Sequence, residues 1–106
     1  MKKLIIVAAL ACTGAHAEFR DGNKLLSEMN GAFGDKMLAM GYIAGTVDSL
    51  SSITICAPQN LTLGQATDMV RQYLEVNPGV RHFSADAIIN RVMSTAWPCA
   101  KKGSGV

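Results

Sequence analysis

The first seventeen residues constrain this chain most, because they predict that it is exported and folds in an oxidising compartment. Two lysines precede an apolar run over residues 4–12, which is too short to span a bilayer. Residues 15–17 (AHA) then have the small-x-small pattern of a cleavage site. We therefore predict a signal peptide over residues 1–17, cleaved near Ala17, and a periplasmic protein.

Two alternatives remain for this segment. The apolar run could be a buried core segment, although a basic start, an apolar run and a cleavage pattern rarely coincide in this order by chance. A lipoprotein would carry its lipid on Cys12, but Leu10 stands one position late for a good lipobox. Both alternatives explain fewer of the features than a cleaved signal does.

Cleavage leaves about 89 residues, enough for one domain (residues 18–100) and a flexible Gly/Ser tail (residues 101–106). The mature part has eight basic and eight acidic residues, so its formal net charge is zero. This balance gives no electrostatic footprint for nucleic acid or for an anionic membrane surface. No later stretch is apolar enough to cross a membrane.

Two cysteines remain after export, Cys56 and Cys99, and an even pair in an oxidising compartment predicts one disulfide. The alternative, a catalytic thiol, needs a nearby base. His82 is the only histidine left, and nothing in its surroundings marks it as a base. We therefore expect a disulfide that ties the middle of the chain to its end.

Hydrophobic periodicity predicts an all-α, four-helix domain with short loops. Thr62 and Gln65 form a T-x-x-Q capping box, and Phe83 with Ile88 has the spacing of a hydrophobic staple. Residues 51–61 form a connection, with a short extended piece at 53–55. The predicted helices cover residues 21–29, 35–51, 62–76 and 84–97, with Asp21 or Asn23 capping the first.

The second predicted helix is apolar on more than one face, as expected of a central helix packed on several sides. Gly41 and Gly45 lie four residues apart, which places two spots without side chains on one face of the helix, so another backbone can approach closely. We interpret the pair as a packing device, and Tyr42, Tyr73 and Trp97 as core anchors.

The mature chain is poor in catalytic groups. Asp48 and Asp68 could form an acid–base pair, but surface or capping roles suit both carboxylates better. We expect no enzymatic activity, no cofactor and no metal site.

An ordered set of motifs resembles the Rap/Tai-type immunity proteins of type VI secretion. The most specific motifs are the Gly41-Tyr42-Ile43-x-Gly45-x-Val47-Asp48 segment and the closing Pro98-Cys99. Phe19-x-Asp21-Gly22-Asn23-x-Leu25-Leu26, Cys56-x-Pro58, Gln65, Val70, Tyr73-Leu74, Pro78 and Arg81 complete the set. The resemblance covers residues 19–99. Many members have a second cysteine pair, at positions that here lie close to Met29 and Ala39.

The resemblance implies a periplasmic, non-catalytic inhibitor of a peptidoglycan amidase, commonly acting as a homodimer whose loops occlude the amidase active site. Exposed loops on a rigid scaffold are suited to entering a cleft. The implied partner-binding residues are Gln59, Asn60 and Leu61 after Cys56, and Arg81 and His82 before the last helix.

Two other functions fit a short exported chain of this kind. A small acid-activated periplasmic chaperone would expose apolar surface as its carboxylates are neutralised. A small hydrolase would need a catalytic set that the composition hardly supplies. Aggregation suppression at low pH separates the chaperone from the immunity protein.

Overall fold

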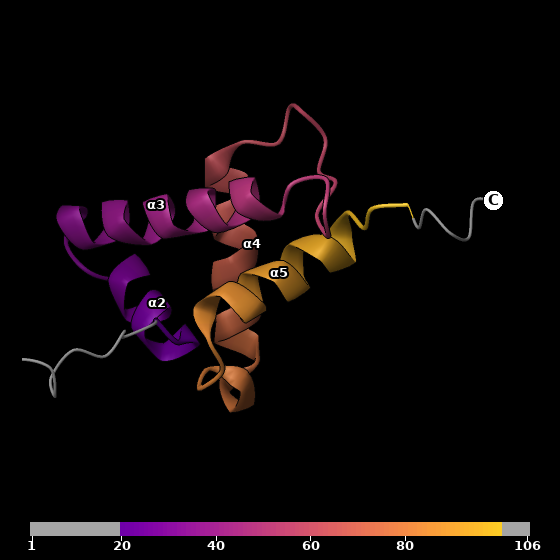
Figure 1. Cartoon of the computed structure of the whole chain (residues 1–106). Helices are drawn as coiled ribbons and strands as arrows, with labels where there is room; N and C mark the ends of the chain where they lie inside the picture. The colour runs from indigo at the N-terminus through magenta and orange to yellow at the C-terminus, as the bar shows by residue number, and fades with distance from the viewer. Residues whose placement is uncertain (1–19, 101–106) are drawn as a thin grey trace, which may run out of the picture.

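The computed structural model describes residues 20–100, and both the predicted signal peptide and the tail at 101–106 lie outside this part. The described chain is all-α, in the order α2 (Gly22–Met29), α3 (Phe33–Leu50), α4 (Leu63–Val76), the 3₁₀ turn η1 (Pro78–Val80) and α5 (Ala85–Ala96). In Figure 1, α3 lies across one end of α4, α5 runs diagonally beside α4, and α2 lies below the start of α3. The prediction of four helices is confirmed.

The helix starts follow from their caps. Asp21 accepts a hydrogen bond from the Lys24 backbone amide, at 2.8 Å, and so caps α2. The predicted capping box at α4 is confirmed in both directions, since Thr62 and Gln65 each accept from the other's backbone amide. By contrast, Ser84 precedes α5 without a side-chain cap bond.

The core lies where the four helices meet, and α3 contacts the other three. Leu25 and Met29 of α2 are buried as predicted, as are the apolar stripes of α4 and α5. These residues are fully removed from water because each helix turns one apolar stripe inward. The residues that form the core are Leu25, Met29, Ala39, Ile43, Ile55, Ala66, Val70, Leu74, Ala85, Ile88, Ile89 and Met93.

Two details differ from the sequence-based predictions. Helix α3 begins at Phe33, two residues before the predicted start, and only Ala39 and Ile43 of its side chains are fully buried. The predicted extended piece at 53–55 is wrong, since Ile53 and Thr54 lie in a turn and only Ile55 makes isolated bridges. The turn forms because three successive amides share one helix-end carbonyl, that of Leu50.

The start of the described chain is fastened to the start of α5. The Ala85 amide donates to the Arg20 carbonyl at 2.8 Å, and the Gly22 amide donates to the Phe83 carbonyl at 3.0 Å. A β carbon on Gly22 would lie 2.8 Å from the Arg81 carbonyl oxygen, so only glycine fits this junction. Helix α2 is therefore held against the segment that precedes α5.

A partly buried ion pair between Arg20 and Glu28 secures the same junction. The Arg20 guanidinium donates to both carboxylate oxygens of Glu28, at 2.9 and 3.1 Å, and lies 5.4 Å from the centre of the Tyr42 ring. Burial raises the pKa of Tyr42, and the Asp86 carboxylate raises it further. Tyr42 is half-buried at the edge of the core, close to the anchoring role predicted for it.

Candidate partner-binding surface

The connection after α3 begins with a tight, fixed turn. The Leu50 carbonyl accepts hydrogen bonds from the amides of Ile53, Thr54 and Ile55, at 3.0 to 3.2 Å. Ser52 adopts a left-handed conformation, with φ of 67°, and its amide donates to the Ile55 carbonyl. Ile55 is buried, so this turn is closed by backbone bonds and sealed by a core side chain.

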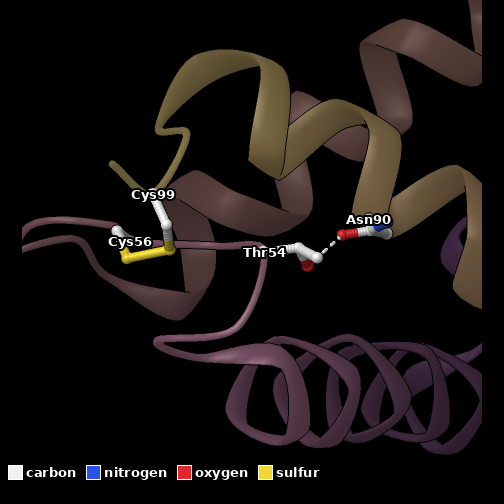
Figure 2. Close-up of a disulfide and its surroundings, with 4 residues drawn as sticks. All are labelled: Thr54, Cys56, Asn90 and Cys99. Atoms are coloured by element: carbon white, nitrogen blue, oxygen red, sulfur yellow. Dashed lines mark hydrogen bonds between the residues drawn. A yellow bond between two sulfur atoms is a disulfide. The ribbon is translucent and has the colours of Figure 1, made fainter. Parts of the chain in front are cut away.

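Three links then fasten the connection to α5 and the segment after it, and Figure 2 shows two of them, the Thr54–Asn90 hydrogen bond and the disulfide. The Thr54 hydroxyl donates to the side-chain oxygen of Asn90 on α5 at 2.6 Å. The Cys56 amide donates to the Trp97 carbonyl at 2.9 Å. Cys56 and Cys99 form the predicted disulfide. Because Cys56 and Cys99 are bonded to each other, neither is free to act as a catalytic thiol.

The predicted contact residues Gln59, Asn60 and Leu61 follow directly on this anchored stretch. Gln59 and Asn60 are exposed, whereas Leu61 is half-buried and its amide donates to the Pro58 carbonyl at 3.1 Å. In Figure 1 this part of the connection rises above α3 before α4 begins. The loop is short and is fixed at one end by the disulfide and at the other by the capping box. It is therefore a preorganised projection.

The second predicted loop lies at the opposite end of α4. The Arg81 guanidinium is hydrogen-bonded inside the domain. Its Nε donates to the Leu74 carbonyl at 2.7 Å and its Nη2 to the Glu75 carbonyl at 3.2 Å. It thereby supplies donors to the last carbonyls of α4. His82 is exposed, and its ring lies 4.3 Å from that of Phe83. Arg81 thus positions the loop, and His82 and Phe83 are its outward-facing groups.

A groove along α4 and α5 joins the two loops. A hollow of about 660 Å³ between the helices shares Tyr73 and Arg91 with a second hollow of about 360 Å³ that reaches Phe83. The larger hollow shares Met69 with a third, of about 440 Å³, beside Asn60. Since α4 has 14 residues, the two loops are about 20 Å apart.

The lining of this groove is mainly apolar, with one charge of each sign among the side chains that form it. Arg91 lies at its centre and Asp68 at the end near Asn60. The side chain of Val76 is apolar, yet Val76 is 66% exposed to solvent.

Sequence reasoning missed most of this groove. Met69, Tyr73 and Val76 are spaced by four and three residues, so they form a second apolar stripe beside the core stripe of α4. Only the core stripe was expected, and Tyr73 was assigned to it. A helix with two adjacent apolar stripes is the signal that could have indicated a surface groove, with Arg91 opposite on α5.

The two carboxylates considered for catalysis are not brought into one hollow. Asp68 borders the hollow beside Asn60, whereas Asp48 borders a separate shallow one with Leu61 and Thr62. Within residues 20–100 no three histidine, cysteine or acidic side chains are grouped as a metal site would need. None of the helices in this part is long and apolar enough to cross a membrane.

The glycines of the most specific motif do not have the predicted packing role within the chain. A β carbon built on Gly41 or Gly45 meets no atom within 4 Å, so no element of the described domain packs there. The interpretation of the pair as an internal packing device is wrong. The glycine that admits a close backbone is Gly22, whose added β carbon would also lie 2.7 Å from Ile88.

Together these features define a small helical domain, closed by a disulfide, with an anchored loop at each end of α4 and hollows along α4 and α5. A family model for Rap1a immunity proteins matches residues 21–99, essentially the whole described domain. The chain therefore belongs to the Rap1a immunity protein family. A search of curated proteins gives no match.

Proposed function

We propose that this protein is a periplasmic, non-catalytic immunity protein that binds and inhibits a peptidoglycan amidase delivered by type VI secretion. Family membership supports the immunity role, and the N-terminal residues support export. The observation that carries the proposal is the continuous surface formed by the two anchored loops and the α4–α5 groove. As the resemblance implies, we also propose that the protein acts as a homodimer.

Inhibition by occlusion requires a loop that keeps its shape when it enters a cleft. A flexible loop loses conformational entropy on binding, which weakens the complex. The residues 57–61 loop avoids most of this loss, because the disulfide and the Thr54–Asn90 bond fix one end and the α4 cap fixes the other. Gln59 and Asn60 then offer polar contacts to the partner, and Leu61 packs against the core.

The groove gives the same partner a second area of contact. A segment of the amidase that lies between α4 and α5 would cover Met69, Tyr73 and Val76 and place an acidic or carbonyl oxygen against Arg91. Contact along about 20 Å brings both loops within reach of one partner. His82 and Phe83 would close the far end.

The test mixes the purified protein with the amidase encoded beside its gene or, where none is encoded, with a panel of type VI amidases. Binding is measured by calorimetry and inhibition by release of muropeptides from isolated peptidoglycan. Asn60→Lys and Arg91→Glu should each weaken binding at least tenfold. Asn23→Lys and Lys24→Glu make the same changes on exposed positions of α2, outside the surface, and should not.

Two results of this experiment would contradict the proposal. If the wild-type protein neither binds nor inhibits any amidase, and does not protect cells that express one in the periplasm, the amidase is not its partner. If it binds but both pairs of variants behave alike, the surface is misplaced. In that case the family role stands and the loop assignment does not.

A further inference from the structure

The connection between α2 and α3 contains Asn30 followed by Gly31, the only asparagine–glycine pair in the chain. Asn30 is exposed and Gly31 is half-buried, and both lie in the turn that follows Met29, the last residue of α2. Glycine has no side chain to shield its backbone nitrogen, so this nitrogen can reach the side-chain carbonyl carbon of the preceding asparagine. The other asparagines all precede a residue with a side chain; they are Asn23, Asn60, Asn77 and Asn90.

Arg71 of α4 holds the Asn30 side-chain amide in one orientation. The Arg71 Nη1 donates a hydrogen bond to the side-chain oxygen of Asn30 at 3.2 Å. Because a guanidinium group only donates hydrogen bonds, the atom that faces it is the amide oxygen and not the amide nitrogen. When a nucleophile attacks the amide carbon, negative charge develops on this oxygen, and a cationic donor already in place stabilises that charge. Arg71 is therefore positioned to favour attack on the Asn30 amide.

The nitrogen that would attack lies at a helix end. The Gly31 amide donates to the Glu28 carbonyl at 3.1 Å, in the last turn of α2. Hydrogen bonds at helix ends open by local fraying, which needs much less free energy than unfolding of the whole domain. The Gly31 nitrogen is therefore released from time to time while the rest of the domain stays folded.

We propose that Asn30 is a site of spontaneous covalent modification, at which the Gly31 nitrogen attacks the side-chain amide and converts asparagine into aspartate or isoaspartate. The Gly31 nitrogen loses its proton and bonds to Cγ of Asn30, and the amide nitrogen leaves with this proton as ammonia. The product is a cyclic succinimide. Water then opens the ring, giving aspartate by addition at Cγ and isoaspartate by addition at the backbone carbonyl carbon. The net reaction consumes one water and releases one ammonia, without oxidation or reduction.

The two products change the connection between α2 and α3 differently. Aspartate keeps the backbone and places a carboxylate against the Arg71 guanidinium, as an ion pair near the surface. Isoaspartate carries the backbone through the former side chain, which adds one carbon to the connection. Neither Asn30 nor Arg71 lines the hollows along α4 and α5, so the inference is independent of the proposed function.

Incubation of the purified protein at physiological temperature, followed by proteolysis and mass spectrometry, tests the site. The peptide with Asn30 should exchange its amide nitrogen for oxygen at least tenfold faster than the peptide with Asn60, which is also exposed but precedes leucine. Labelling with protein isoaspartyl methyltransferase measures the isoaspartate in the same peptide. Equal rates at Asn30 and Asn60, or conversion without any isoaspartate, would overturn the proposal.

Variants of Gly31 and Arg71 test the chemistry, each at a temperature at which circular dichroism shows a folded domain. Gly31→Ala should slow the conversion at least fivefold, because the methyl group shields the nitrogen. The new β carbon meets the end of the exposed Asp35 side chain, which can turn away. Arg71→Ala should also slow the conversion, and Arg71→Lys should retain more of the rate, since a cationic donor remains.

Each variant has a result that contradicts its assigned role. An unchanged rate in Gly31→Ala would show that the Gly31 nitrogen is not the nucleophile and would overturn the proposal. A rate that is equal or higher in Arg71→Ala would show that the guanidinium does not stabilise the charge on the Asn30 oxygen. The role of Arg71 would then be overturned.

Discussion

Glycines occupy two opposite environments in this small domain. At Gly22 the backbone of α2 meets the Arg81 carbonyl and the Ile88 side chain so closely that a methyl group cannot be added. At Gly41 and Gly45 the helix surface faces open space. The same residue type thus closes the internal junction of α2 with α5 and leaves α3 bare. Helical glycine spacing indicates that another backbone can approach, but not which one.

The difference extends to whole regions. The side formed by α2, α5 and the connection after α3 is fastened by the disulfide, the Arg20–Glu28 ion pair and the Thr54–Asn90 bond. The outer surface of α3, where Phe33, Leu38 and Gly41 are exposed, has no such link among the described residues. Changes on the fastened side should therefore destabilise the domain, whereas changes on the outer surface of α3 should not.

The largest effect is expected from removing the disulfide. Replacing both Cys56 and Cys99 with serine releases a crosslink between residues 43 apart and should lower the free energy of unfolding by about 4 kcal/mol. Urea denaturation followed by circular dichroism measures this change. A loss below about 1 kcal/mol would show that the other links suffice to hold the connection.

Gly22→Ala should lower the free energy of unfolding by about 3 kcal/mol, because the new methyl group meets a backbone oxygen that cannot move alone. Gly79→Ala is the control, since its added methyl group meets nothing. Equal midpoints for the two variants in thermal unfolding would contradict the close packing described for α2.

Arg20→Ala should destabilise the domain by about 2 kcal/mol, because it leaves the buried Glu28 carboxylate without its two hydrogen bonds. Arg20→Lys should recover only part of this loss, since lysine cannot form the two-pronged contact. Chemical denaturation of the three proteins at neutral pH gives the order. If lysine restores full stability, the paired geometry of the guanidinium is unimportant.

The smallest expected effect is a gain in stability rather than a loss. Gly41→Ala should raise the free energy of unfolding by about 0.5–1 kcal/mol, because alanine is the better helix former and the position is open. Urea denaturation of the two proteins measures this gain. A destabilised variant would mean that some part of the chain does pack on Gly41.

Local signals in the sequence predicted the local structure well. The caps at Asp21 and Thr62, the helix order and the Cys56–Cys99 disulfide were all predictable, since each depends on neighbouring residues or on one pairing choice. The signal peptide stays a prediction, because it lies outside the described residues.

Features that depend on how the helices pack together were harder to predict from the sequence. Arg81 was expected to contact a partner, but its guanidinium is held by carbonyls of α4, which no local pattern reveals. The exposure of Gly41 depends on where α2, α4 and α5 are placed, and the groove depends on two helices meeting at Tyr73 and Arg91. The loop positions Gln59 and Asn60 were predicted to be accessible, and they are exposed.

The backbone bonds between Arg20 and Ala85 and between Gly22 and Phe83 join the two ends of the domain. During folding, α2 can therefore be secured only after the segment before α5 has docked. A product that terminates early, anywhere before residue 81, retains α2 without the segment that holds it. Incomplete chains are thus expected to be degraded rather than to accumulate as half-active fragments, and abundance in the cell should depend on translation reaching the final helix.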